Sequence, residues 1–144
     1  MLKISLTLFL SIYALQSYSA CVKTQWANLK EGPSLSYETK WVIPKNTPLK
    51  IIKRMPNWYL IEEVDRVRSW VNASKLTESY FCGIVKWEKT RIKPMRSKKK
   101  LLAYYDQSFR ILKFKEKAKG KKWVLVKNQF GTEGWVSKRS LWVH

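Results

Sequence analysis

The sequence is poor in the residues that carry most enzymatic chemistry. Its 144 residues include one histidine, His144, two cysteines, and ten acidic residues against 29 lysines and arginines. It contains no HExxH motif, no glycine-rich phosphate loop and no Cys/His cluster with metal-ligand spacing. A Cys–His dyad would need His144 at the chain end, where residues are usually mobile, and a free cysteine of low pKa. We therefore expect no catalytic residue, no metal site, no cofactor and no enzyme activity.

Long apolar runs are also absent outside the N-terminus. Lys3 is followed by an apolar run from Ile4 to Leu15 and then by Ser17-Tyr18-Ser19-Ala20. This order of a positive charge, an apolar segment and small residues is typical of a secretory signal peptide, here residues 1–20. The run is too short to cross a membrane as a stable helix. We expect an exported protein, periplasmic or extracellular, with no transmembrane helix in the mature chain.

The two cysteines, Cys21 and Cys82, are the only ones in the chain. An even number of cysteines in an oxidising compartment favours a disulfide, which we predict between these two residues. A lipid anchor on Cys21 is the alternative, because a cysteine directly after a signal peptide is the acylated residue of lipoproteins. Tyr18 argues against the anchor, since such signals usually carry leucine at that position.

A phrase of aromatic and β-branched residues occurs twice in the chain. Trp58-Tyr59-Leu60-Ile61 returns as Trp123-Val124-Leu125-Val126, and the pairs Trp58/Trp123, Trp70/Trp135 and Leu76/Leu141 share one offset of 65 residues. A shared offset predicts a tandem repeat, and runs of this composition favour strands. We expect an all-β protein with one domain at 21–80 and a second, divergent one at 81–144. Each is near the lower size limit for a self-sufficient core.

The repeated tryptophans are the candidate binding residues. Adjacent residues of a strand face opposite ways, so Trp70 and Val71 cannot both point inward, and neither can Trp135 and Val136. If the valines fill the core, the tryptophans lie on the outer surface, where an indole can stack on a ligand and donate a hydrogen bond. The alternative is that they are core or inter-domain contacts. The predicted ligand-binding residues are Tyr37, Trp41, Trp58, Trp70, Trp123 and Trp135.

Three segments of the first repeat carry a resemblance to a known family. The stretch from Ala27 to Ser34 with its Gly32-Pro33, then Asn57-Trp58-Tyr59, then Trp70-Val71, resembles a bacterial SH3 (SH3b) domain. The second repeat keeps Gly134-Trp135-Val136 but lacks the Gly-Pro. The resemblance implies two tandem small SH3-like β-barrels after the signal peptide. It also implies a binding module for peptidoglycan or an envelope peptide, with any hydrolase a separate partner.

The formal net charge of +19 suggests a further class of partner. Such a chain attracts polyanions in a salt-dependent way. Tryptophans among lysines would suit single-stranded nucleic acid, but export argues against that partner and favours anionic envelope polymers. Two alternatives to wall binding therefore stay open: an adaptor whose aromatic faces contact another envelope protein, and a salt-dependent binder of anionic polymers.

Overall fold

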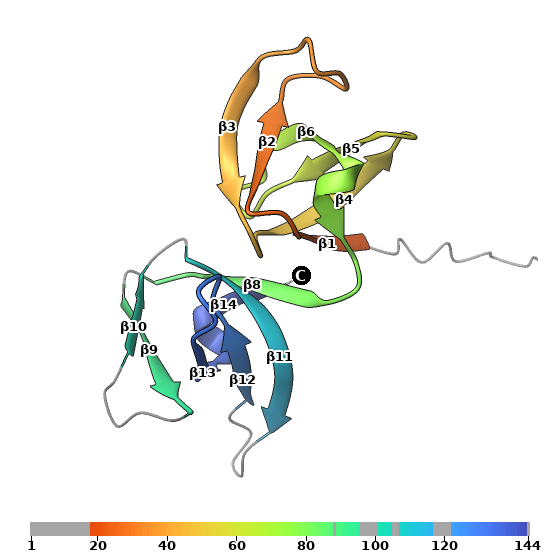
Figure 1. Ribbon diagram of the computed structural model, residues 1–144. Helices are drawn as coiled ribbons and strands as arrows, with labels where there is room; N and C mark the ends of the chain where they lie inside the picture. The colour runs from red at the N-terminus through yellow and green to blue at the C-terminus, as the bar shows by residue number, and fades with distance from the viewer. Residues whose placement is uncertain (1–17, 88, 96–100, 105–106, 117–121, 144) are drawn as a thin grey trace, which may run out of the picture.

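The computed structural model describes residues 18–87, 89–95, 101–104, 107–116 and 122–143. In this part of the chain two antiparallel seven-stranded sheets each curve into a small barrel, one above the other in Figure 1. The prediction of an all-β protein with two small SH3-like barrels is confirmed. No helix of the described residues is long and apolar enough to span a membrane. Most of the expected signal peptide, residues 1–17, and His144 lie outside the described residues.

The two barrels have the same strand order. The first sheet runs β3-β2-β6-β5-β4-β1-β7 and the second β10-β9-β13-β12-β11-β8-β14. The first comprises β1 (Tyr18–Val22), β2 (Trp26–Lys30), β3 (Thr39–Pro44), β4 (Pro48–Arg54), β5 (Trp58–Glu62), β6 (Arg68–Asn72), the 3₁₀ turn η1 (Ala73–Lys75) and β7 (Leu76–Thr77). The second comprises β8 (Phe81–Val85), β9 (Lys89–Pro94), β10 (Leu101–Tyr104), β11 (Ser108–Glu116), β12 (Lys122–Lys127), β13 (Glu133–Ser137), η3 (Lys138–Ser140) and β14 (Leu141–Val143). The register shifts at Ile51/Lys53 in one barrel and at Ile111/Lys113 in the other.

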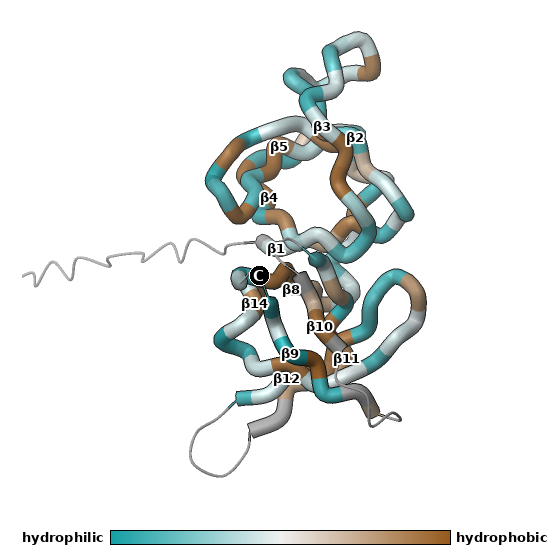
Figure 2. Tube along the Cα trace, turned by 90° about the vertical axis from the view of Figure 1, so that its left-hand side faces the viewer, coloured by the Kyte–Doolittle hydropathy of each residue, from teal (hydrophilic) through white to brown (hydrophobic). Residues whose placement is uncertain are grey.

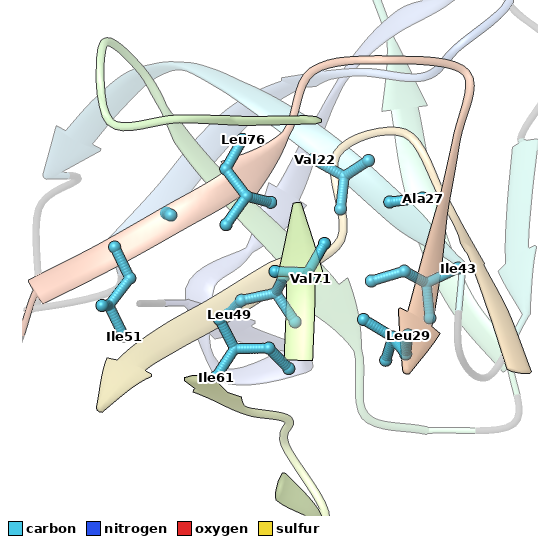
Figure 3. Packing of buried hydrophobic residues seen from close by; sticks show 10 residues of the cluster. Val22, Ala27, Leu29, Ile43, Leu49, Ile51, Ile61, Val71 and Leu76 are labelled. Atoms are coloured by element: carbon cyan, nitrogen blue, oxygen red, sulfur yellow. The ribbon is translucent and has the colours of Figure 1, made fainter. Parts of the chain in front are cut away.

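Each barrel has its own apolar core. Figure 3 shows the first, in which Leu29, Leu49, Ile61 and Val71 converge from four strands. Figure 2 shows hydrophobic and hydrophilic residues interspersed along the chain in both barrels. Val71 and Val136 are fully buried, whereas Trp70 and Trp135 beside them are only partly buried. The expectation that the valines fill the core and the tryptophans face outward is confirmed.

The first barrel closes through its N-terminal strand. Tyr18, Ser19 and Ala20 pair with β4, and Cys21 and Val22 pair with Thr77 and Leu76 of β7. The expected cleavage after Ala20 therefore falls inside β1. A chain cleaved there keeps the two residue pairs between β1 and β7 that complete the barrel.

A disulfide and several hydrogen bonds hold the two barrels together. Cys21 of β1 is bonded to Cys82 of β8, so the predicted pairing is confirmed. The Tyr80 hydroxyl donates to the Val22 carbonyl oxygen at 3.3 Å, and the Ser108 hydroxyl donates to the Lys45 carbonyl oxygen at 2.7 Å. Figure 1 shows β1 and β8 facing each other at this junction. The barrels are thus in fixed contact.

Gly134 and Ser69 occupy equivalent positions of the two barrels, and we expect replacement by alanine to have opposite effects on stability at the two positions. A Cβ at Gly134 would overlap Ile92 Cγ2 and lie 3.0 Å from the Lys93 carbonyl oxygen. We expect Gly134→Ala to lower the free energy of unfolding by about 1–3 kcal/mol, the usual cost of overpacking. Ser69, 65 residues earlier, is buried and its Oγ has no hydrogen-bond partner. Because Ser69→Ala removes an unpaired polar atom, that variant should be neutral or stabilised. Urea denaturation of both variants checks the pair, and equal destabilisation would contradict it.

Candidate functional site

Side chains from three strands share the outer face of the first barrel. On β2, Ala27 and Leu29 are buried in the core, so Trp26, Asn28 and Lys30 project to the other side. On β5 and β6 the same alternation places outward a set of four residues: Trp58, Leu60, Trp70 and Asn72. The β2–β6 pairing at Lys30 and Trp70 brings these strands side by side. Aromatic, amide and basic groups therefore lie together on one surface.

This surface is hollowed into a groove of about 460 Å³, which we call the outer groove. Its lining consists of Thr24, Gln25, Trp26, Asn28, Lys30, Leu35, Trp58, Asn72 and Lys75. Trp26 is 53% exposed and Trp58 is partly buried, so both indoles are accessible. Two accessible indoles with three amide side chains suit a ligand that has flat faces and carbonyl groups, such as a sugar or a peptide.

A buried lysine fixes the loop that borders the outer groove. Lys30 is only 9% exposed, and its Nζ donates to the carbonyl oxygens of Leu35 and Tyr37 at 3.2 and 2.8 Å and to Thr39 Oγ1 at 3.2 Å. These three acceptors compensate the cost of burying an ammonium group. The lysine thereby holds residues 31–38 in place, and Leu35 of this loop lines the groove.

Gly32 in the same loop allows Tyr37 to pack directly on the backbone. A Cβ at position 32 would lie 2.5 Å from the Tyr37 ring, so any larger residue would displace that ring. The Gly32-Pro33 pair of the family resemblance therefore supports the loop's internal packing. Tyr37 is half exposed and does not line the outer groove.

The charge at the outer groove is positive. Lys30 and Lys75 line it, and none of the acidic residues that the structure describes does. On the same face of β5, the Glu62 carboxylate accepts a hydrogen bond from Arg68 Nε at 2.9 Å, and this bond lowers the pKa of Glu62. That acid is thus neutralised by its partner, and Lys75 remains exposed at the groove to attract a carboxylate or phosphate.

The structure does not bring the six predicted aromatic residues into one site. Trp58 lines the outer groove, and Trp70 lies on the same face without lining it. The Trp41 indole donates instead to the Glu63 carboxylate at 3.0 and 3.2 Å, away from the groove. Trp123 and Trp135 are partly buried on β12 and β13 of the second barrel, where the Lys93 ammonium lies 4.8 Å from the Trp123 ring centre.

Of the nine residues that line the outer groove, only Trp58 was predicted as a binding residue, and Trp26 and Lys30 are the most important of the others. Trp26 is not among the predicted binding residues, although the alternation Trp26-Ala27-Asn28-Leu29 marks it as outward-facing. No sequence pattern indicates the role of Lys30, because that role depends on the path of the following loop. Among the described residues no group of three or more His, Cys, Asp or Glu side chains could hold a metal ion.

One family model matches part of the first barrel. Residues 27–77 match the family described as bacterial SH3 domain. The matched segment runs from β2 to β7 and contains most of the residues that line the outer groove. No curated protein matches the chain.

Several solved structures align with most of this chain at low sequence identity. NlpC2 from Trichomonas vaginalis is 11% identical and aligns over 88% of this chain and 48% of its own, with a TM-score of 0.39. NlpC1 from the same organism is 11% identical and aligns over 96% of this chain and 50% of its own, with a TM-score of 0.40. An NlpC/P60 family protein from Bacillus cereus is 12% identical and aligns over 88% of this chain and 56% of its own, with a TM-score of 0.38. The chain spans about half the length of these proteins.

Proposed function

We propose that this protein, whose first barrel is a bacterial SH3 domain, is a non-enzymatic module that binds peptidoglycan through the outer groove. The observation that carries the proposal is the pairing of two accessible indoles, Trp26 and Trp58, with amide side chains and an exposed lysine in one groove. Indole faces would stack on sugar rings or peptide planes. Lys75 would attract the carboxylates of the stem peptides.

The proposed location is outside the cytoplasm. A bacterial SH3 domain and a disulfide are compatible with an extracytoplasmic protein, because disulfides persist in oxidising compartments. Residues 1–20 would serve as the signal peptide. Any hydrolase that acts on the bound wall would be a separate protein.

The test is retention of the purified protein on isolated sacculi at low and high salt. Trp26→Ala and Trp58→Ala should each weaken binding by about 2 kcal/mol, roughly thirtyfold, as expected for aromatic residues at the centre of an interface. The residual binding of the native protein at high salt should persist, because stacking is little screened by ions.

Trp41→Ala is the matched control, since Trp41 is an exposed tryptophan of the same barrel that lies outside the groove. Its binding should equal that of the native protein. Equal retention of all three variants, or complete release by salt, would mean that the groove is not the binding site.

A further inference from the structure

A second concave site lies between the two barrels and shares no residue with the outer groove. This junction cleft has a volume of about 270 Å³. Lys23 and Lys45 enter it from the first barrel, and Arg110 of β11 and Lys127 of β12 enter it from the second. Four cationic side chains from distant parts of the sequence converge there, and within the described part of the chain no acidic residue lines the cleft.

Most of this positive charge is unpaired. Lys127 forms an ion pair with Glu133 at 3.2 Å. For Lys23, Lys45 and Arg110 the structure shows no salt bridge anywhere in the residues it describes. A cleft lined by charges of one sign concentrates its field and attracts counter-ions. Three unpaired cations match a multiply charged anion better than the single charge of a carboxylate.

The groups that shape the cleft are held in place. The Arg110 guanidinium lies 4.4 Å from the ring centre of Tyr80, which orients its planar donors. The Tyr80 hydroxyl donates to Val22 and lies 3.4 Å from the buried Asn46 side chain. Burial raises the pKa of Tyr80, and the positive charge of Arg110 only partly offsets this rise, so the phenol stays protonated at neutral pH. The adjoining disulfide fixes the two walls relative to each other.

We propose that the junction cleft binds a phosphate-bearing anion, with Arg110 and Lys45 as its main ligands. A planar guanidinium presents paired N–H donors that match phosphate oxygens, and the lysines add mobile point charges. The junction cleft is distinct from the outer groove, and a bound phosphate would account for part of the large positive charge of the chain. The phosphate could be soluble or carried on a lipid head group.

The test uses calorimetric titration of the purified protein with inorganic pyrophosphate, with acetate as the carboxylate control. We expect binding of pyrophosphate but not of acetate at equal ionic strength. Lys45→Gln and Arg110→Gln should each weaken it about tenfold, since each removes a charge-assisted hydrogen bond. Lys45→Gln is the cleaner variant, because Arg110 also packs on Tyr80.

Lys53→Gln is the matched control, because Lys53 is an exposed lysine of the first barrel that does not line the cleft. It should change the affinity less than twofold. An equal loss in Lys53→Gln and Lys45→Gln, or no affinity for pyrophosphate, would overturn the proposal. Vesicles containing phosphatidic acid distinguish the two sources: capture that Lys45→Gln abolishes indicates a lipid phosphate, whereas binding of pyrophosphate without capture indicates a soluble one.

Discussion

Replacing Cys21 and Cys82 by alanine is expected to lower the free energy of unfolding by about 4 kcal/mol in the chain-entropy account of cross-links. The two cysteines are 61 residues apart in the sequence, so the disulfide closes a long loop and strongly restricts the unfolded chain. Both are almost completely buried, at 2% and 0% exposure. Guanidinium denaturation of the native and double-variant proteins, followed by tryptophan fluorescence, gives the difference.

The single variant Cys21→Ala provides the control for this experiment. It breaks the same cross-link and leaves one thiol, so its loss of stability should equal that of the double variant. Dithiothreitol should destabilise the native protein and leave both variants unchanged. A loss below about 1 kcal/mol would show that hydrogen bonds such as that from Ser108 to Lys45 hold the junction without the disulfide.

Local alternation explains why much of the fold could be predicted from the sequence. The period of two along a strand placed Val71 and Val136 in the cores and Trp70 and Trp135 outside, and the structure agrees. The pairing of the cysteines followed from their number and from the expected compartment. The alternation needs only residues that are close in the sequence, and two cysteines allow only one intramolecular disulfide.

The candidate site was harder to predict, because its composition depends on where loops lead. Tyr37 and Trp41 were grouped with Trp58 by residue type, yet Tyr37 packs on Gly32 and Trp41 bonds to Glu63. The first contact depends on the path from β2 to β3, with its register shift at Leu29/Lys30, and the second on the turn from β5 to β6, and neither path has a periodic sequence pattern.

The junction cleft could not be predicted from the sequence at all. Lys45 and Arg110 belong to different barrels, and only the docking of those barrels brings them together. By contrast, the outward position of Trp26 follows from the same alternation as that of Trp70, because its neighbour Ala27 on β2 is buried.

Phe109→Ala should destabilise the second barrel by about 3–5 kcal/mol, because it removes a large buried side chain and leaves a cavity. Phe109 is 1% exposed and packs in a cluster formed only by residues of β8 to β14. If the barrels unfold as separate units, amide hydrogen exchange will accelerate in strands β8 to β14 while strands β2 to β7 stay protected. Exchange measured by mass spectrometry on the intact protein resolves the two regions.

Leu49→Ala, at the equivalent place in the core of the first barrel, should give the reverse pattern with a loss of about 2–5 kcal/mol. Faster exchange throughout the chain in both variants would show one cooperative unit instead.

We expect the same variants to affect the two binding sites differently. Because the outer groove is built from the first barrel alone, Phe109→Ala should retain binding to sacculi. The junction cleft needs Arg110 beside Phe109, so the same variant should lose affinity for pyrophosphate.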